Sequence, residues 1–529
     1  MVSRRGFLTG FAVSSLALTA GCASGRSGVP SSGTGAEGTR PLPIPPLAPA
    51  TVGADGVRRF TLEAKAGSTE MRAGQSTPTW GYNGAILGPT LRAKRGEQVA
   101  FTIHNALAEP TTVHWHGMHV PAACDGGPHQ TIEPDGVWQP SWTVEQPAAT
   151  LWYHPHPHGS TEKHVYRGLS GFFLLDDADS DRLELPKDYG VDDIPLVIQD
   201  RRLTADGALD ESDPSDIGLL GDLIITNGIA GAHLDVTTER VRLRVLNGSS
   251  GRLYNLAFSD NREFQLIATD GGLLTAPVPL RHIQISPGER VELVVQVRAG
   301  EPVTLRTLPI EQRAGIKKPA AFGFDDTFDI LRLRPAGKLK ASAPVPNSLV
   351  AIPALVAAGT PATRTFDLRW HMINNQRMDM NRIDMTIPVD TTEVWTVRNS
   401  DDWPHNFHVH DVQFQITAID GQTPPPELAG WKDTVYTTPG PAYTLAMRFA
   451  GHTDPTYPYM YHCHLLMHED AGMMGQFLIL APGQQPTPMT MDMPGMAGHD
   501  MPATTTPGTG GHDMPGMTMP GMGTHGGHG

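Results

Sequence analysis

Short alternating runs of hydrophobic and polar residues dominate the chain from Arg58 onward. Gly, Pro and Asn interrupt these runs every few residues, which is typical of turns between strands. Because successive side chains of a strand point to opposite faces, the alternation predicts strands that bury one face each. The pattern therefore predicts an all-β fold.

A weak internal repeat is visible within this pattern. An Asn-containing turn is followed each time by an alternating strand that itself ends in Asn, as repeated β-sandwich domains would require. The three copies are Asn83-Gly84 with residues 98–105, Asn227-Gly228 with residues 241–247, and Asn374-Asn375 with residues 393–399. The length of 529 residues also fits about three domains of about 100–200 residues each.

Changes in composition divide the chain. Segments rich in Asp and Pro, or in Ala and Pro, predict boundaries near residues 180 and 350, and so domains at residues 51–180, 181–350 and 351–482. Residues 23–50 are rich in Gly, Ser and Pro and are expected to form a disordered linker. The segment 483–529 holds nine of the 21 Met residues and four His residues, and it is expected to be a disordered tail whose soft side chains suit Cu(I).

The stretch around Cys463 carries the most specific chemistry. His468 lies five residues after Cys463, and Met473 lies five residues after His468, so the stretch needs only one further His for the Cys-His-His set with a weak axial Met of an electron-transfer copper site. On a strand, Cys463 would point one way while His462 and His464 point the other, so one strand would contact two metal centres. The alternative from this stretch alone is a tetrahedral zinc site.

Three further pairs of histidines two residues apart argue against a lone zinc site. They are His114 with His116, His154 with His156, and His408 with His410. On a strand such a pair points to one face, whereas on a helix the two side chains would diverge by about 200°. The pairs therefore favour a shared metal cluster built on strands.

Together these motifs resemble the four copper-binding motifs of multicopper oxidases, in the same order, over residues 55 to 482. The motifs are His114-Trp115-His116-Gly117, residues 152–156, residues 405–410, and His462-Cys463-His464 through Met473. Asp125-Gly126-Gly127-Pro128, Asn83-Gly84 with Gly88-Pro89, and Trp431-Lys432-Asp433-Thr434 make the chain most similar to bacterial copper-efflux oxidases and bilirubin-oxidase-like laccases. The resemblance implies three consecutive cupredoxin-like Greek-key β-sandwich domains.

The resemblance also implies four copper ions and assigns their ligands. It assigns His405, Cys463, His468 and axial Met473 to the type 1 copper, and His114 and His408 to the type 2 copper. It gives the type 3 pair His116, His154, His156, His410, His462 and His464. Electrons would pass from Cys463 through its neighbouring histidines to the cluster, which would reduce O2 to two waters.

Proton-relay and substrate residues are implied in the same way. Reduction of O2 consumes protons, and Asp125 and Glu469 match the family's relay carboxylates. Asp401 matches an acidic residue of the cuprous-ion site, while Trp403 stands where copper-efflux oxidases usually carry Met, and their Met-rich insertion is missing here. The axial Met473 predicts a modest type 1 potential. We read His119, His129, His158 and His164 as ordinary histidines outside the ligand set.

The ends of the chain and its charge bear on location and partners. Residues 1–22 contain Ser3-Arg4-Arg5-Gly6-Phe7-Leu8, which resembles a twin-arginine export signal, so a periplasmic or outer-surface protein is expected. Cys22 stands where a lipoprotein would be acylated, although Thr19 departs from that motif, so a lipid anchor stays open as the sole membrane attachment. The net charge of -15 argues against nucleic acid as a partner. With Cys463 on copper and Cys22 in the signal, Cys124 has no disulfide partner.

Three functions remain open at this point. The first is an exported, monomeric oxidase that couples oxidation of Cu(I), and of phenols as a by-product, to O2 reduction in copper tolerance. The second is a laccase or bilirubin-oxidase-like enzyme with an organic substrate. The third is a copper-binding or scaffold protein without turnover, which the complete ligand set disfavours.

Overall fold

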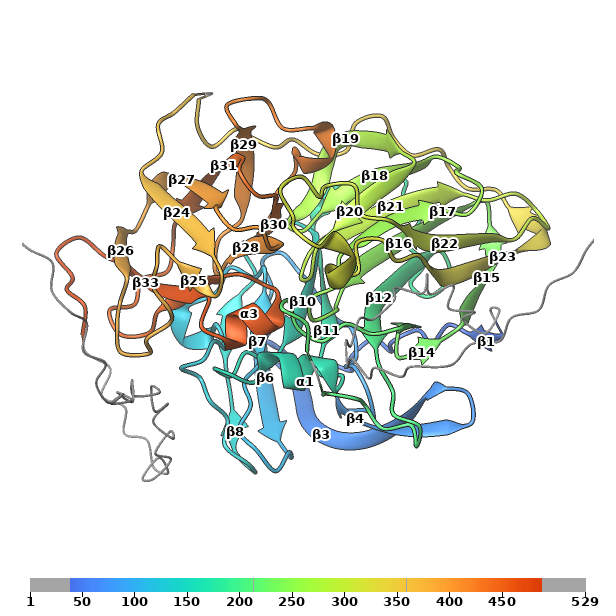
Figure 1. The fold of residues 1–529 in the computed structure, drawn as a ribbon, viewed down its shortest axis with the longest axis horizontal. Helices are drawn as coiled ribbons and strands as arrows, with labels where there is room; N and C mark the ends of the chain where they lie inside the picture. Colours follow the sequence, from blue (N-terminus) through green and yellow to red (C-terminus); the bar gives the residue numbers. More distant parts are fainter. Residues whose placement is uncertain (1–38, 213, 358, 488–529) are drawn as a thin grey trace, which may run out of the picture. The chain divides into compact units, whose positions relative to one another are not determined.

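The computed structural model describes residues 39–212, 214–357 and 359–487, and six β-sheets form their framework (Figure 1). The sheets form three pairs in chain order, and one hydrophobic cluster dominates each pair. The all-β prediction is therefore confirmed. The predicted export signal (1–22) and most of the predicted tail lie outside the described residues.

The first domain consists of a six-stranded and a four-stranded sheet. The larger sheet contains β2 (Thr51–Val52), β3 (Arg58–Arg72), β4 (Gln75–Tyr82), β6 (Gln98–Asn105), β8 (Val137–Trp138) and β9 (Ser141–Thr143). The smaller contains β5 (Leu91–Lys94), β7 (His114–His116), β10 (Ala149–His154) and β11 (Gly171–Asp176). Phe101 from the larger sheet packs on Trp115 and Phe173 from the smaller, so both sheets share one core.

The second domain consists of a six-stranded and a seven-stranded sheet. One runs through β1 (Arg40–Pro41), β15 (Ala232–Thr238), β23 (Phe328–Lys340), β22 (Val303–Leu308), β17 (Tyr254–Phe258) and β20 (His282–Ile285). The other runs through β14 (Ile229–Ala230), β13 (Leu223–Thr226), β12 (Asp193–Arg201), β16 (Arg240–Asn247), β21 (Arg290–Gln296), β18 (Phe264–Thr269) and β19 (Gly272–Leu280).

The third domain repeats this plan with two five-stranded sheets. They contain β25 (Met372–Ile373), β24 (Arg364–Arg369), β27 (Thr391–Asn399), β31 (Ala442–Phe449) and β29 (Phe414–Ile419), and β26 (Met385–Pro388), β33 (Met474–Leu480), β32 (Tyr459–His462), β28 (His405–Val409) and β30 (Thr434–Thr437). The described α-helices are short: α1 (Thr161–Tyr166), α2 (Ala178–Arg182) and α3 (Leu466–Asp470). None of the helices in the described part of the chain has the length and apolar character needed to cross a membrane.

The Asn residues of the sequence repeat occupy equivalent positions in the three domains. The turn residues Asn83, Asn227 and Asn374 all adopt a positive φ, between 48° and 57°. In each domain the side chain of this Asn forms hydrogen bonds with backbone groups of one strand, and that strand pairs in parallel with the alternating strand of the repeat. The parallel pairs are β3 with β6, β12 with β16, and β24 with β27. The repeat in the sequence therefore reflects one hydrogen-bonding pattern used three times.

The strand-ending asparagines are equally consistent. Asn105, Asn247 and Asn399 are fully buried, and each accepts a hydrogen bond from the N–H two residues later. The amide nitrogen of each also donates to two backbone carbonyls. A buried side-chain amide whose oxygen and nitrogen both have hydrogen-bond partners fixes the loop that follows the strand. In the third domain this loop carries Asp401 and Trp403.

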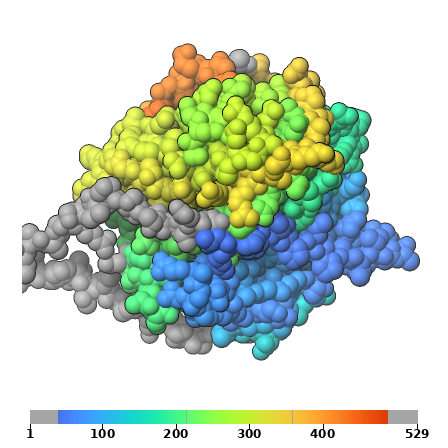
Figure 2. Space-filling view, turned by 90° about the vertical axis from the view of Figure 1, so that its right-hand side faces the viewer, coloured from blue at the N-terminus to red at the C-terminus, as the bar shows by residue number. Residues whose placement is uncertain are grey.

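The segment 39–50, expected to belong to a disordered linker, has a defined place in the structure. β1 pairs in parallel with β15, and the Pro46 carbonyl accepts a hydrogen bond from Thr90 N–H. Figure 2 shows these dark-blue residues lying along the green and yellow surface of the second domain. The Pro-rich composition suggested a free linker, but extended Pro-rich backbone keeps its carbonyls available as acceptors, and the folded domains supply the donors.

We predict that Asn227→Ala lowers the free energy of unfolding by about 2 kcal/mol. The substitution removes hydrogen bonds to Val197 N–H, Pro195 O and Pro43 O, and it leaves a non-glycine residue at φ 48°. Chemical denaturation measures the loss. The matched control is Asn261→Ala, because Asn261 is exposed at a similar φ of 58°. Equal losses for both variants would show that the side-chain bonds of Asn227 contribute nothing.

Candidate metal centres

The predicted cluster histidines lie on strands, or just beyond the ends of strands, where the first and third domains meet. His156, His410 and His464 follow the ends of β10, β28 and β32, so the prediction of a strand through all of them is only partly correct. β7 pairs with β10 so that His114 lies opposite His154, and β28 pairs with β32 so that His408 lies opposite His462. The two domains then bring their histidines face to face. His114 stacks on His410 and His116 stacks on His408, each with 3.8 Å between ring centroids.

All eight predicted cluster histidines are fully buried at this junction. Seven of them form overlapping groups whose ligand atoms lie within 4.8 Å of one another: His114, His116 and His154; His114, His408 and His410; and His156, His410 and His462. The ring centroid of His464 lies 4.8 Å from that of His116, so His464 borders the same cluster. Among the described residues, all these histidines come from the first and third domains.

A second group contains the predicted type 1 residues. The Nδ1 atoms of His405 and His468 lie 3.1 Å apart, and Cys463 Sγ lies 3.8 Å from the first and 3.6 Å from the second. The imidazoles are held from outside, because His405 Nε2 faces Asp401 Oδ2 at 3.4 Å and His468 Nε2 donates to Asp216 O at 2.9 Å. Three donor atoms therefore converge on one point in the interior.

Met473 adjoins this group through the backbone. Cys463 N–H donates to Met473 O at 3.1 Å, and Met473 N–H donates to His468 O at 2.9 Å. Helix α3 carries His468, and its turn returns the chain to β33 beside β32 (Figure 1). The side chain of Met473 is fully buried, as an axial ligand would be.

The two predicted relay carboxylates contact the outer nitrogens of cluster histidines. Asp125 Oδ2 lies 2.7 Å from His410 Nδ1, while Glu469 lies 3.3 Å from His156 Nδ1 and 3.3 Å from His462 Nδ1. Burial raises the pKa of Asp125 and of Glu469 well above the usual values, and the neighbouring Asp411 and Asp470 add to this. Both carboxyls are thus suited to holding a proton beside the cluster.

The predicted substrate residues border the Cys463 group. The Asp401 side chain is only 3 % exposed. Burial opposes its ionisation, yet hydrogen bonds from His405 and from the N–H groups of Trp370 and Asp402 hold the pKa of Asp401 below its usual range. Trp403 is partly buried and lies nearly parallel to His468, with 6.1 Å between centroids. Asp401 is therefore an anion in contact with a predicted type 1 ligand.

The histidines that we interpreted as ordinary lie outside both groups of predicted copper ligands. His158 is exposed, His164 is buried against Glu109, and His129 bonds Gln476. His119 pairs with Asp411, which raises the pKa of His119 to about 9 although burial opposes it. Cys124 is a half-buried thiol without a disulfide partner among the described residues, as predicted.

Comparison with known proteins agrees with this geometry. Sequence models of multicopper oxidase domains match residues 63–180 and 352–482. The chain is 34% identical over 449 residues to a multicopper oxidase of Staphylococcus haemolyticus (strain JCSC1435), covering 84% of this chain and 93% of that protein. It is also 34% identical over 486 residues to the cell division protein FtsP of Escherichia coli (strain K12), covering 90% of this chain and 99% of that protein.

Solved structures give the same answer. A laccase from Pediococcus acidilactici Pa5930 has 35% identity and a TM-score of 0.76, over 83% of this chain and 94% of its own. A multicopper oxidase from Campylobacter jejuni, described as a metallo-oxidase, has 25% identity and a TM-score of 0.72, over 84% and 96%. The chain belongs to the multicopper oxidase family. The three sheet pairs are its cupredoxin-like domains.

Unpaired nitrogens of the cluster fit the copper ions that membership of this family implies. Within the described residues, buried ring atoms without a hydrogen-bond partner include His114 Nε2, His116 Nδ1, His154 Nε2, His408 Nε2 and His464 Nε2. Buried polar atoms are rarely left without a partner, so these atoms call for a ligand. The opposite nitrogens of His154 and His408 contact the carbonyls of Pro155 and Asp433, as the outer nitrogens of metal-bound histidines usually do.

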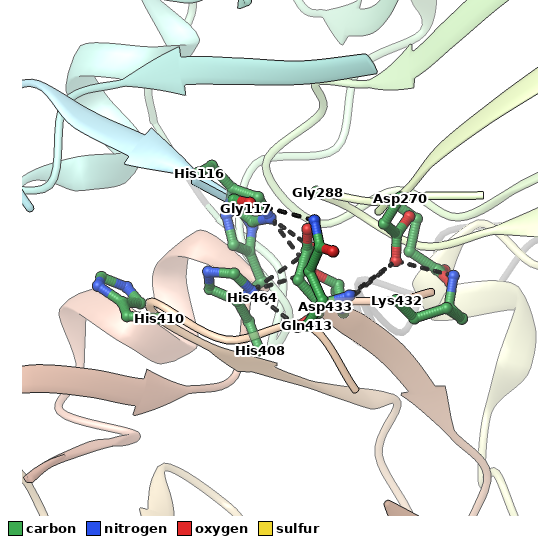
Figure 3. Close-up of polar contacts among 12 residues, drawn as sticks. His116, Gly117, Asp270, Gly288, His408, His410, Gln413, Lys432, Asp433 and His464 are labelled. Atoms are coloured by element: carbon green, nitrogen blue, oxygen red, sulfur yellow. Dashed lines mark hydrogen bonds and ion pairs between the residues drawn. The ribbon is translucent and has the colours of Figure 1, made fainter. Parts of the chain in front are cut away.

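His116 is turned the other way, and Asp433 is the reason. His116 Nε2 lies 3.0 Å from Asp433 Oδ1, which leaves Nδ1 of His116 unpaired in the cluster. Asp433, which Figure 3 shows beside His116, is held by Arg290 from the second domain through Oδ1 at 2.8 Å and Oδ2 at 2.6 Å. In the sequence, Asp433 stands out only as part of a family motif, and Arg290 was not predicted. Nothing in the alternation of β21 distinguishes Arg290 from an ordinary exposed strand residue.

A second buried pair completes this junction of the three domains. Lys432 Nζ lies 2.9 Å from Asp270 Oδ2 and 2.9 Å from Glu289 Oε1. Asp270 Oδ1 in turn accepts a hydrogen bond from Arg290 N–H. Gly117 lies against the network with φ 82°, and a Cβ there would approach Asp433 Oδ2 to 2.5 Å. The glycine of the first copper motif thus makes room for the carboxylate of the third domain.

We predict that Asp433→Asn costs about 3–5 kcal/mol of stability, because Arg290 loses its counter-charge in the interior. It should also reduce the near-ultraviolet absorption of the type 3 pair, since His116 loses the acceptor that fixes its orientation. Copper content per chain and the absorption spectrum measure the second effect.

Asp325→Asn is the matched control for this change. It breaks a surface pair with Arg313, in which the Asp325 side chain is 56% exposed. This change should cost less than about 1 kcal/mol and leave the spectrum unaltered. A full type 3 spectrum in Asp433→Asn would contradict the role assigned to Asp433.

Proposed function

We propose that the protein is an exported oxidase that takes electrons from Cu(I) at the Cys463 group and uses them to reduce O2 at the histidine cluster, in copper tolerance. When bound, the copper ions supply one-electron transfer at the first site and four-electron reduction of O2 to water at the second. The residues of the chain hold these ions, admit the donor and deliver protons. His405, Cys463, His468 and Met473 would hold the type 1 ion, and the eight cluster histidines the other three.

The carrying observation is the composition of the segment that covers the Cys463 group. The His371 ring lies 5.1 Å from that of His468, and Met378 N–H donates to the carbonyl of Gly472, next to Met473. Met372 and Met378 are both partly exposed in this segment. Imidazole and thioether groups are ligands that Cu(I) prefers, so a soft cation would find such donors in the segment whose His371 packs against His468.

Charge at this surface supports the same donor. Asp401 is anionic and in contact with His405, while the neighbouring Asp402 pairs with the exposed Lys317. A negative group beside the type 1 ligand attracts a cation and stabilises the Cu(II) product more than Cu(I). The relation to the Campylobacter jejuni metallo-oxidase is in keeping with this proposal.

An organic donor is the second candidate. Trp370 is 49% exposed, with the Arg369 guanidinium stacked on its ring, and Trp403 lies beside the same surface. Aromatic side chains of this kind bind planar phenols by stacking. The similarity to the laccase from Pediococcus acidilactici supports phenol oxidation as a second reaction of the site.

A protein without turnover is the third candidate. Relatives named cell division protein FtsP indicate that chains similar to this one can have other roles. The convergence of Cys463, His405 and His468 argues against it, because the three donors are buried and aimed at one point. A blue copper-loaded sample would support a copper–thiolate bond. The proposed roles of the export signal, of the acylation site Cys22 and of the Met-rich tail concern residues outside the described part of the chain.

Our first functional prediction concerns the donor. Copper-loaded protein should consume O2 rapidly with chelated Cu(I) as the sole reductant, and deletion of residues 488–529 should weaken that response. Asp401→Asn should slow Cu(I) oxidation about tenfold, an effect of about 1.4 kcal/mol, with less effect on a methoxyphenol.

Asp402→Asn is the matched control, because it removes the neighbouring charge without touching His405. Oxygen-electrode rates at equal copper content give the comparison. Fast phenol turnover with little response to Cu(I) would refute the cuprous donor and favour the organic one.

The second functional prediction concerns protons. Glu469→Gln keeps the shape of the side chain but removes a carboxyl in contact with His156 and His462, so steady O2 reduction should fall about 10²-fold. Reduction of the type 1 copper by a mediator should keep its rate. The control is Glu162→Gln, a partly buried carboxyl whose Oε1 accepts a hydrogen bond from Leu219 N–H. Unchanged oxygen turnover in Glu469→Gln would exclude Glu469 from the relay.

A further inference from the structure

Gln476 holds a segment of the third domain that lies next to the Cys463 group. This segment, residues 377–385, runs from the turn after β25 into β26, and β26 lies beside β33 (Figure 1). We call it the methionine loop, because it contains Met378, Met380 and Met385. Gln476 is a fully buried residue of β33. A buried amide needs hydrogen-bond partners, and Gln476 finds those of its side chain outside its own strand.

The side chain of Gln476 has partners at both ends. Its Nε2 lies 2.6 Å from the carbonyl oxygen of Arg382 and 3.2 Å from those of Asp379 and Met380, all in the methionine loop. These acceptors around Nε2 leave Oε1 to accept at the other end of the amide, so His129 Nε2 donates to it at 2.8 Å. Because His129 belongs to the first domain, one amide connects that domain to the methionine loop.

The backbone of Gln476 makes a second connection to the same loop. Its N–H donates to Asp384 Oδ2 at 2.8 Å, and its carbonyl accepts a hydrogen bond from Asp384 N–H at 3.0 Å. Asp384 Oδ1 accepts a hydrogen bond from Arg382 Nε at 2.6 Å, and Arg382 also donates to the carbonyl of Arg377 at 2.9 Å. The loop is therefore fixed from Arg377 to Asp384 on one residue of β33.

The fixed loop reaches the Cys463 group at Gly472. Met378 N–H donates to Gly472 O at 2.9 Å, next to the predicted axial ligand Met473. Gly472 has φ 94°, and a Cβ there would come within 3.4 Å of Arg377 Cβ, so the loop lies in close contact with this turn. Met378 and Met380 are partly exposed. The clamp on the loop backbone thus holds two thioether side chains at the turn that carries Met473.

We propose that Gln476, with His129 as its second anchor, is a positioning residue that sets how tightly the methionine loop binds the cuprous donor. The inference rests on the proposed function, because it assigns the loop to Cu(I). A ligand that binds an already fixed loop loses less free energy to the ordering of that loop. The first domain thereby influences the donor specificity of a site whose predicted type 1 ligands all lie in the third domain.

Gln476→Leu tests the clamp, because leucine is similar in size but forms no side-chain hydrogen bonds. With the copper-loaded full chain, the KM for chelated Cu(I) should rise about tenfold. The kcat at saturating Cu(I) and the KM for a methoxyphenol should not change. Hydrogen exchange followed by mass spectrometry should become faster in residues 377–385. An unchanged KM for Cu(I) in this variant would refute the proposal.

Two variants of His129 test the anchor in the first domain. His129→Ala removes one partner of the amide and should raise the KM for Cu(I) by a smaller factor than Gln476→Leu. His129→Gln should restore the wild-type KM, because its amide nitrogen can donate to Gln476 Oε1 in place of the ring nitrogen. A wild-type KM in His129→Ala, or equal impairment of both variants, would refute this anchor.

Gln199→Leu is the matched control. Gln199 is also buried, and its Nε2 donates to Gly248 O at 3.1 Å in the second domain. This change should lower the melting temperature and leave both the KM for Cu(I) and the exchange of residues 377–385 at wild-type values. If Gln476→Leu does no more than Gln199→Leu, Gln476 is merely structural and the proposal fails.

The same measurements distinguish this proposal from the proposed function. If the wild-type protein does not consume O2 with Cu(I), the cuprous donor is refuted, and the role of the clamp in donor binding is refuted with it. If the wild-type protein oxidises Cu(I) and both Gln476→Leu and His129→Ala keep its KM, the clamp alone is refuted and the cuprous donor stands.

Discussion

The buried ion pair between Arg290 and Asp433 is the interaction on which the arrangement of the metal centres depends. It joins the second domain to the third, and through His116 it reaches the first. Removing two charges from water is unfavourable, so such a pair persists only where hydrogen bonds satisfy every polar atom. Here the backbone carbonyls of Thr150, Gly288 and Asp270 accept hydrogen bonds from the remaining N–H groups of the Arg290 guanidinium. The Thr434 hydroxyl donates a hydrogen bond to the Asp433 carboxylate. This network of hydrogen bonds around the ion pair fixes the three domains in one relative position.

The same constraint explains why three similar domains have different chemistry. Each repeats the buried asparagines and the parallel strand pairs, so the backbone plan is common to all three. The first and third place histidines on facing strands at their mutual boundary. The second places charged side chains there instead, and its contribution is geometric and electrostatic. Domains of one fold have thus been specialised by the residues at their boundary, which agrees with the view that function depends on sites rather than on folds.

Much of the fold could be predicted from the sequence because its signals are local. The alternation fixed the strands, the asparagines marked the repeat, and paired histidines on strands identified the cluster. Arg290, His371 and Gln476 could not be found in this way. Arg290 acts across three domains, His371 takes its meaning from a ring more than ninety residues away in sequence, and Gln476 looks like a single polar residue in an otherwise apolar strand. The place of residues 39–50 was missed for a related reason, since their partners lie in β15 and beside β5.

The stacked pairs His114 with His410 and His116 with His408 have a consequence for biogenesis. Each pair takes one ring from the first domain and one from the last, so neither domain can form the cluster while the other is still being synthesised. Burial keeps the pKa values of these imidazoles low, so the stacked rings are neutral. The cluster is therefore complete only when the last domain has been synthesised and has packed against the first, so its assembly depends on both ends of the folded chain.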